Sequence, residues 1–404
     1  MSTQLNEVED KKKYYINSQN LIWSVIALVT LLKLSLACSA ENVLYKSTDF
    51  DVHRNWMSIT RHLPVREWYF DDYDGKTVHT LDYPPLFAWF EYSIANFPLM
   101  DYLLENGYLD ERCLDRLGDD DNETSHSCVV FQRLTVVLGD IVFLLGAYVA
   151  SKNVSFVMHP DDHVAATKVN VTVLLLLVTN AGLIILDHIH FQYNGMMLGL
   201  LLASIGFMIE GKVIPSALFY CLLISMKHLY ITLGPLYFIF MLRSHCFDWI
   251  KVTGRSKYVR SFNIVNFAHL GAFTLSVLVF PFLPFLAADN SIQQLIQIKS
   301  RLFPFARGLC HDYWAGNIWA LYLFIDKILR FVSRKLPFVE VQLPDVSPFS
   351  CAIILFIGLL PGIVCAWIHA SKGKRIVDKE MLFVNAVVSR CVLYHRYTLK
   401  PNFS

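Results

Sequence analysis

Charged residues are scarce in this chain of 404 residues, because Asp, Glu, Lys and Arg together make up only 17% of it. An average soluble domain carries about 25%. The net charge is +1, so no overall field attracts nucleic acid, and we expect no nucleic-acid partner. The mean hydropathy of +0.41 is too high for one soluble core. The shortage of charge therefore predicts an integral membrane protein.

Paired cysteine motifs are also missing. The nine cysteines form no CxxC pair and no cysteine and histidine set with zinc spacing, so we predict neither a metal centre nor a cofactor. Cys113 and Cys128 both fall in an acidic segment, where an oxidising compartment would allow a disulfide. Spacing along the chain does not fix the distance between their Cα atoms, so the pairing stays open.

Long apolar runs are abundant, whereas internal repeats and low-complexity tracts are absent. The first run covers residues 21–40. Further runs lie at about 129–150, 169–187, 193–210, 213–242, 264–286, 314–332, 349–370 and 380–394. Several reach 18 residues, enough to cross a bilayer core of ~30 Å. We therefore predict an all-α polytopic membrane protein.

The distribution of charge predicts the orientation of the chain. Lys11, Lys12 and Lys13 precede the first run, which places the tail 1–20 in the cytoplasm. Residues 41–128 hold 18 of the 34 acidic residues and 7 of the 35 basic ones, a balance of −11. We expect residues 21–404 to form one polytopic domain, with 41–128 as its first loop on the non-cytoplasmic side.

Two later segments need special treatment. The run 213–242 has too few residues for two full spans and too many for one, and Lys227 and His228 fall at its middle. Two short helices that meet near the far face would keep this pair away from the hydrocarbon centre. Because a basic cluster follows 349–370, the count of crossings requires 314–332 to be re-entrant or surface-lying.

Four segments combine ionisable side chains with aromatic ones. The first, Ser47–Trp56, follows the first span closely, and its candidate site residues are Asp49, Asp51, His53, Arg54 and Trp56. A helix from residue 50 would put Asp51 and Arg54 on one face and leave Asp49 at an N-cap-like position. On local sequence alone, a capped interfacial helix with solvated charges is the favoured interpretation.

The second segment, Leu81–Leu86, carries Asp82 and Tyr83 before two prolines. Pro84 and Pro85 force an extended conformation before them and begin a helix after them. The alternative interpretation is an interfacial turn with an aromatic belt.

The third segment, Asp187–Gly195, lies between two spans, and its candidates are His188, His190, Gln192 and Tyr193. The spacing His-x-His could bind a metal on a strand, but no third ligand follows at a set distance. A short polar hairpin that binds a head group agrees better with the pattern.

The fourth segment places Arg301 and Arg307 on a loop interrupted by proline and glycine. Guanidinium groups make forked hydrogen bonds to phosphate oxygens, so the pair suits an anionic ligand. The alternative is contact with the head groups of membrane lipids by snorkelling side chains.

Taken in order, STDFDVHRNW, LDYPPLFAWFEY, DHIHFQYNG and RLFPFARGLCHDYWAGNIWALY resemble the dolichyl-phosphate-glucose-dependent α-1,3-glucosyltransferases of the endoplasmic reticulum. The resemblance covers about residues 20–390. Within that family, the stretches His53–Trp56 and Cys310–Ala315 look most like the member that adds the second glucose to the lipid-linked oligosaccharide.

The resemblance implies a glycosyltransferase C-type fold with interfacial helices in a long first lumenal loop. It implies Asp49 as the catalytic aspartate, in a multi-pass protein of the endoplasmic reticulum membrane whose active site faces the lumen. The implied reaction transfers glucose from dolichyl phosphate glucose to the monoglucosylated high-mannose dolichyl-diphosphate oligosaccharide. The new linkage is α-1,3, and one displacement inverts the anomeric centre.

Two rival interpretations remain. Family members continue to a His-x-His-Glu-Lys motif that this chain lacks, so it resembles a C-terminally shortened form, and a catalytically impaired scaffold is one alternative. A membrane transporter is the other. Transporters usually carry repeats and midplane charges, whereas here the polar clusters lie in or beside loops and no repeat is visible.

Overall fold

The computed structural model describes residues 2–39, 47–71, 74–75, 79–116, 124–251, 258–303, 318–335, 343–344 and 348–369. The chain forms two compact units. The first consists mainly of residues 1–228 and 265–301, and the second mainly of residues 229–264 and 302–372. Across the described ranges the regular structure is helical apart from one two-stranded hairpin, which confirms the predicted all-α class.

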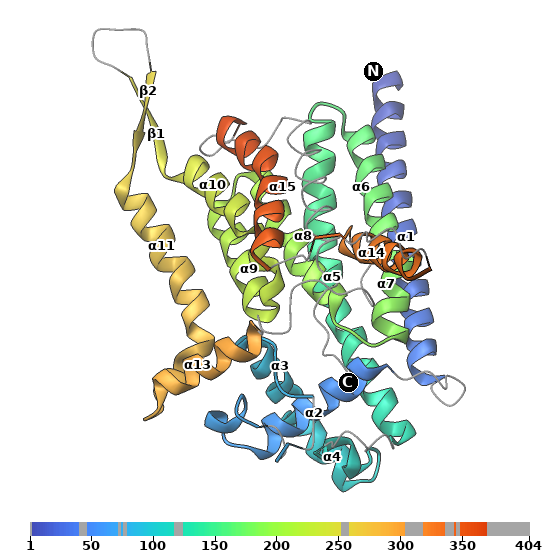
Figure 1. Ribbon diagram of the computed structural model, residues 1–404. Coiled ribbons are helices and arrows are strands. Elements are labelled where there is room, and N and C mark those ends of the chain that lie inside the picture. The colour runs from blue at the N-terminus through green and yellow to red at the C-terminus, as the bar shows by residue number, and fades with distance from the viewer. Residues whose placement is uncertain are drawn as a thin grey trace. The chain divides into compact units, whose positions relative to one another are not determined.

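The centre of the first unit is a helical bundle. Its members are α1 (Ser2–Cys38), α5 (His126–Met158), α6 (His163–Val178), α7 (Ala181–Ile184), α8 (Asn194–Glu210) and α9 (Val213–Met226). Figure 1 shows α1, α5, α6 and α8 running alongside one another. A Cβ atom at Gly146 of α5 would overlap the carbonyl of Gly199 in α8, so these two backbones touch. Small residues permit such close helix packing in membranes.

Four helical stretches are long and apolar enough to cross a membrane. They are Tyr14–Cys38, His126–Met158, His163–Ile189 and Ile264–Leu286, and α8 and α9 are shorter apolar helices. The four stretches confirm the apolar runs predicted at 21–40, 129–150, 169–187 and 264–286. The chain is thus an all-α polytopic membrane protein.

The segment between α1 and α5 folds into a group of short helices that we call the cap. It contains α2 (Thr48–His62), η1 (Val65–Glu67), α3 (Pro85–Ala95), α4 (Pro98–Glu105) and η2 (Glu111–Leu114). Figure 1 shows α2, α3 and α4 at one end of the bundle, and the N-terminus of α1 at the other. The helices predicted for this segment are therefore present.

The chain returns to the cap after α11 (Ile264–Val279). It continues through η5 (Phe280–Phe282), α12 (Leu283–Leu286) and α13 (Ser291–Leu302). The indole of Trp89 donates to the carbonyl of Pro281 at 3.0 Å, and the amide of Gln294 donates to the carbonyl of Arg66 at 2.8 Å. These bonds attach η5 and α13 to the cap.

The start of α2 differs from the prediction. Ser47 is the N-cap, because its Oγ accepts the backbone N–H of Phe50 at 3.3 Å. Asp49 therefore lies in the first turn of α2 and not at the cap. By contrast, α3 begins at Pro85 directly after Pro84, as the proline pair predicts.

The second unit contains α10 (Gly234–His245), the antiparallel strands β1 (Phe247–Lys251) and β2 (Tyr258–Phe262), α14 (Ile318–Lys335) and α15 (Pro348–His369). The guanidinium of Arg243 in α10 donates to the carbonyl of Trp367 in α15 at 2.8 Å. Within α14, Arg330 pairs with Asp326 at 2.6 Å, and α14 is not among the candidate spans found in the described residues.

The run 213–242 breaks in its middle, as predicted. Helix α9 ends with Lys227 as its C-cap, and η4 (His228–Leu233) separates it from α10. Two short helices therefore replace one long span, and Lys227 lies at the break between them.

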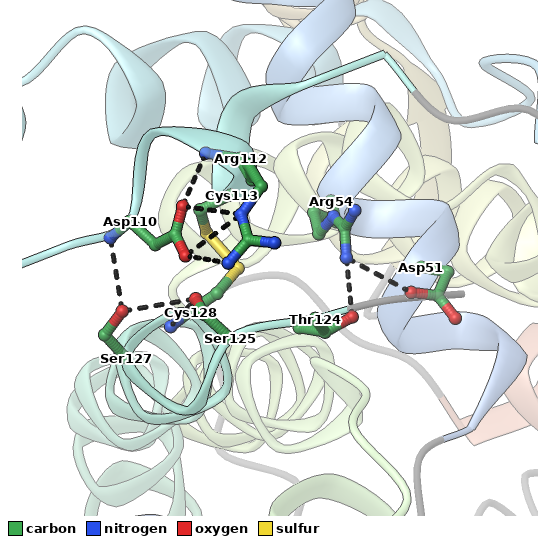
Figure 2. The surroundings of a disulfide bond; sticks show 9 residues. All are labelled: Asp51, Arg54, Asp110, Arg112, Cys113, Thr124, Ser125, Ser127 and Cys128. Carbon is green, nitrogen blue, oxygen red and sulfur yellow. Dashed lines mark hydrogen bonds and ion pairs between the residues drawn. A yellow bond between two sulfur atoms is a disulfide. The ribbon is translucent and has the colours of Figure 1, made fainter. Parts of the chain in front are cut away.

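A disulfide closes the cap onto α5. Cys113 and Cys128 are bonded, with their Cα atoms 5.3 Å apart, which settles the pairing that the sequence left open. Figure 2 shows the surrounding polar groups, in which Arg112 pairs with Asp110 at 2.8 Å. The hydroxyl of Ser125 accepts the backbone N–H of Cys128 at 3.4 Å and caps α5. The bond thus ties η2 to the first turn of α5.

Removing this disulfide should loosen the cap. Cross-links that close loops of about 15 residues stabilise by roughly 3 kcal/mol in the chain-entropy view. We expect the double exchange Cys113→Ser and Cys128→Ser to lower the thermal unfolding midpoint of the purified protein and to speed proteolysis of the cap. The exchange Cys221→Ser, at a buried free cysteine, is the control. Unchanged proteolysis of the cap would contradict the expected effect.

Candidate active site

The carboxylate of Asp49 is held by the segment that precedes α8. Its Oδ2 accepts hydrogen bonds from His190 Nε2 at 3.1 Å and from the amide of Gln192. The hydroxyl of Ser47 donates to the carbonyl of His190. The N-cap residue of α2 and the carboxylate of Asp49 therefore both bind His190. The side chain of Asp49 is 12% exposed and that of His190 is 28% exposed. Asp49 is therefore nearly buried, yet lies beside an accessible group.

The backbone of residues 185–195 turns sharply to present these donors. Residues Ile185–Ile189 form a π-helical turn, and Phe191 has φ of 75°, a conformation that costs energy for a non-glycine residue. Asp187 then accepts the backbone N–H groups of Asn194, at 3.2 Å, and of Gly195. The chain reverses between the π-helical turn and the start of α8, and this turn brings both His190 and Gln192 to Asp49.

A chain of amides joins this carboxylate to a lysine. Asn194 Nδ2 donates to Gln192 Oε1, and Lys227 Nζ donates to Asn194 Oδ1 at 3.2 Å. The Lys227 ammonium also lies 5.3 Å from the centre of the Tyr83 ring. The carboxylate of Asp49 and the ammonium of Lys227 are therefore linked through two amide side chains.

Beneath Asp49, one helical turn further along α2, lies a buried pair. His53 Nδ1 is 2.7 Å from Glu91 Oε1, and the ring of His53 meets those of Trp56 and Tyr193 with centroids at 4.9 and 5.2 Å. Burial raises the pKa of the Glu91 carboxyl, and the hydrogen bond from His53 opposes that rise. This pair fixes α2 to α3 below the candidate base. Sequence reasoning missed Glu91, whose only signal was a carboxylate within an aromatic run.

Hydrogen bonds hold the segment that contains Asp82 and Tyr83 against α2. The indole N–H of Trp56 lies 3.2 Å from the carbonyl of His79 and 3.1 Å from that of Thr80. The hydroxyl of Tyr69 donates to the carbonyl of Tyr83 at 2.7 Å. Burial, and then the nearby charge of Asp82, raise the pKa of Tyr69 well above its ordinary value. Tyr83 is thereby held where its ring meets Lys227.

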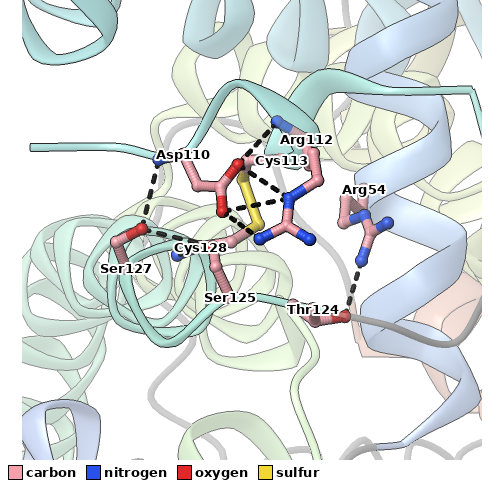
Figure 3. A network of polar contacts seen from close by, with 8 residues as sticks. All are labelled: Arg54, Asp110, Arg112, Cys113, Thr124, Ser125, Ser127 and Cys128. Atoms are coloured by element: carbon pink, nitrogen blue, oxygen red, sulfur yellow. Dashed lines mark hydrogen bonds and ion pairs between the residues drawn. A yellow bond between two sulfur atoms is a disulfide. The ribbon is translucent and has the colours of Figure 1, made fainter. Parts of the chain in front are cut away.

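Asp51 and Arg54 take part in a different contact. Arg54 Nη1 donates to Thr124 Oγ1 at 2.6 Å and lies 3.9 Å from Asp51 Oδ1. Figure 3 shows that Arg54 and Thr124 adjoin the polar network around the disulfide. Asp51 is separated from Asp49 by two residues, about 200° around a helix. It belongs to the attachment of α2 to the start of α5, and the predicted proximity of Asp51 and Arg54 is confirmed.

The remaining candidates have other surroundings. His188 is buried, with Nε2 3.1 Å from Asp140 Oδ2, so the two histidines of His-x-His contact different carboxylates. No three His, Cys, Asp or Glu side chains within the described ranges gather as a metal site. Arg301, in the last turn of α13, donates to the carbonyl of Tyr69 at 3.1 Å and to Thr80 Oγ1 at 3.2 Å. His228 begins η4, and Arg307 lies outside the described residues.

The structure defines a polytopic membrane protein with a helical cap at one end of its bundle, in which a nearly buried carboxylate is linked to a lysine through two amide side chains. The profile of the ALG6, ALG8 glycosyltransferase family matches residues 28–393. The chain belongs to this family.

Relatives from distant organisms share one name, Dolichyl pyrophosphate Glc1Man9GlcNAc2 alpha-1,3-glucosyltransferase. The chain is 39% identical over 365 residues to that of Mus musculus and 37% identical over 365 residues to that of Bos taurus. It is 35% identical over 373 residues to that of Arabidopsis thaliana. These alignments cover 85%, 85% and 87% of this chain, and the chain spans about 65% of the length of each relative.

The buried pair makes a stability prediction. His53→Phe leaves the Glu91 carboxyl buried without its partner, a change that typically costs ~3–5 kcal/mol. Glu91→Gln keeps a hydrogen-bonding group of the same shape and should cost about 0.5–1.5 kcal/mol. Thermal unfolding of the protein in detergent measures both, with the exposed Ser93→Ala as control. Equal losses for the two variants would refute the proposed importance of this pair.

Proposed function

We propose that this chain transfers glucose from dolichyl phosphate glucose to the monoglucosylated high-mannose dolichyl-diphosphate oligosaccharide, forming an α-1,3 linkage. Family membership and the printed names of the relatives support the acceptor and the linkage. The family resemblance supplies the donor. The observation that carries the proposal is the carboxylate of Asp49, fixed by His190 and Gln192 and joined through Asn194 to Lys227.

In the proposed reaction, Asp49 accepts the proton of the acceptor hydroxyl as the acceptor oxygen forms its bond to C1 of glucose. The bond from C1 to the phosphate oxygen breaks, and its electron pair leaves with dolichyl phosphate. A single displacement inverts the anomeric centre, so a β-linked donor gives an α-linked product.

One carboxylate is sufficient for this chemistry. A glycosidase needs two, one as acid and one as base or nucleophile. Here the leaving phosphate is already a stable anion, so it requires cations and not a general acid. Lys227, held near Asp49 by two amides, is the cation we assign, and we propose Arg301 and Arg307 as further phosphate ligands.

The exposure of their side chains divides the other candidate residues into two groups, those that we expect to contact substrate and those that we expect to support the site. We assign substrate contact to the half-buried side chains, which are Asp82, Tyr83, His190, Gln192, Lys227 and His228. Asp51, His53, Arg54, Trp56 and Tyr193 are buried and bonded to neighbouring elements, so we propose that they support the site from behind.

Asp49 and Asp51 should respond differently to mutation. Asp49→Asn removes the base, a loss that typically costs ~100- to 10,000-fold in rate, while the donor should still bind. Asp51→Asn keeps its place beside Arg54 and should cost far less. Single-turnover glucose transfer in microsomes without endogenous activity, at matched protein levels, measures both. A larger loss for Asp51→Asn would overturn the assignment.

We further propose that the tail 1–20 is cytoplasmic and that residues 41–128 face the lumen of the endoplasmic reticulum. Two observations support this orientation. The cap lies at the opposite end of α1 from the lysine-bearing N-terminus, and it contains a disulfide, a bond that persists in oxidising compartments. The basic residues before the first span agree with both.

Glycosylation tests this orientation. Asn122-Glu-Thr lies in the proposed lumenal loop, so we expect an endoglycosidase to increase the gel mobility of the wild-type protein. The variant Asn122→Gln should migrate like the digested protein and show no further shift. Digestion of the cap by a protease added outside sealed microsomes would show the opposite orientation.

A further inference from the structure

Three ionisable side chains meet inside the bundle, apart from the candidate active site. Lys33 of α1 donates to Asp140 Oδ2 of α5 at 2.9 Å, and His188 Nε2 of the π-helical turn lies 3.1 Å from the same oxygen. Their exposed fractions are 5% for Lys33, 8% for Asp140 and 1% for His188. We call these three residues the bundle cluster.

The bundle cluster lies where charge is costly. Lys33 and Asp140 both lie in candidate spans, where an isolated charge is costly but a pair of opposite charges is tolerated. The buried ring of His188 adds a polar contact to the same carboxylate, with Nε2 3.1 Å from Asp140 Oδ2.

The position of His188 in the chain indicates that its contact with Asp140 does more than pack helices together, because it also holds the turn that leads to His190. Lys33 and Asp140 neutralise each other without a third member, so charge balance does not require the histidine. His188 lies on the turn that leads, two residues later, to His190, which holds Asp49. Asp187, the residue directly before His188, accepts the backbone N–H groups of Asn194 and Gly195 at the other end of the same segment.

We infer that the bundle cluster positions residues 187–195 so that His190 and Gln192 meet the carboxylate of Asp49. His188 is thus a positioning residue and not a substrate ligand. His188 anchors the start of the segment to the spans, and Asp187 joins that start to Asn194 and Gly195 at its end. The donors to Asp49 lie between the start and the end. This inference rests on the proposed role of Asp49 as the base.

The packing around Asp140 supports the same conclusion. A Cβ atom at Gly195 would lie 3.4 Å from Asp140 Oδ1 and 3.1 Å from Asp187 Oδ2. The carboxylate of Asp140 is therefore in contact range of the first turn of α8 as well as of the π-helical turn. One side chain of α5 touches both ends of the segment that carries the donors.

A matched pair of variants separates positioning from packing. His188→Leu fills the space but removes the ring nitrogen that contacts Asp140 Oδ2, and it leaves the Lys33 and Asp140 pair in place. His188→Gln restores a polar nitrogen near the place of Nε2. Arg133→Met is the control, because Arg133 also joins α5 to α1, through the carbonyl of Leu36 at 3.2 Å, without touching the segment.

Two readouts are needed. Hydrogen exchange of peptides covering 185–195 reports on the segment without requiring activity, since the backbone N–H groups of His190 and Gln192 bond to Ile185 and Asp187. Single-turnover transfer reports on Asp49. For His188→Leu we expect faster exchange and turnover lower by ~10- to 100-fold, the scale of a misplaced catalytic group, with the KM for the donor unchanged. His188→Gln should recover much of both, and Arg133→Met should alter neither per folded molecule.

The outcomes distinguish the two hypotheses. Unchanged exchange over 185–195 in His188→Leu, or a loss that appears only as lower thermal stability, would overturn the positioning role. Suppose that exchange is faster in His188→Leu but the wild-type protein transfers no glucose. That result would contradict the proposed function and would still support the anchoring of residues 187–195 by His188. If His188→Leu does not accumulate, the paired exchange Lys33→Met and Asp140→Leu removes both charges together. It must give the same exchange result, or the inference is wrong.

Discussion

The contact between Asp49 and the donors of residues 190 and 192 is the interaction on which the rest of the structure depends. It joins two parts of the chain that lie more than 140 residues apart. One is the first turn of a cap helix, and the other is the turn that enters α8. A nearly buried carboxylate keeps its charge only where donors replace the lost water. The histidine and glutamine donors meet that requirement, and Lys227 places a positive charge close by.

Two faces of helix α2 connect the contact between Asp49 and its donors to the remainder of the cap. Asp49 and His53, four residues apart, share one face, which meets the segment before α8 and the buried Glu91. Asp51 and Arg54 lie on the other side, toward Thr124 and the disulfide. A short amphipathic helix can thus present one carboxylate to a site while a second, two residues away, holds the helix in place.

Much of this was predictable from local sequence, and the failures have a physical cause. The length of the apolar runs predicted the spans, and the proline pair predicted the start of α3, because both signals lie within one continuous stretch of the sequence. The contacts of His188 with Asp140 and of His190 with Asp49 depend on carboxylates from α5 and α2, which are distant in the sequence, so local patterns do not predict them. The predicted N-cap position of Asp49 was wrong for a simpler reason. The hydroxyl of Ser47 accepts the N–H of Phe50, so Ser47 is the N-cap and α2 begins one residue before Asp49.

The buried charges follow one constraint from the membrane to the site. Within the spans, Lys33 and Asp140 neutralise each other, because hydrocarbon supplies no water to stabilise either charge. At the end of the bundle, Asp187 is satisfied by the N-terminus of α8, where unpaired backbone N–H groups favour an anion. Asp49 is held by the side chains of His190 and Gln192, which are partly exposed, that of His190 by 28%. The carboxylate that we propose as the base therefore differs from Asp140, whose partners Lys33 and His188 are buried, in the exposure of the groups around it.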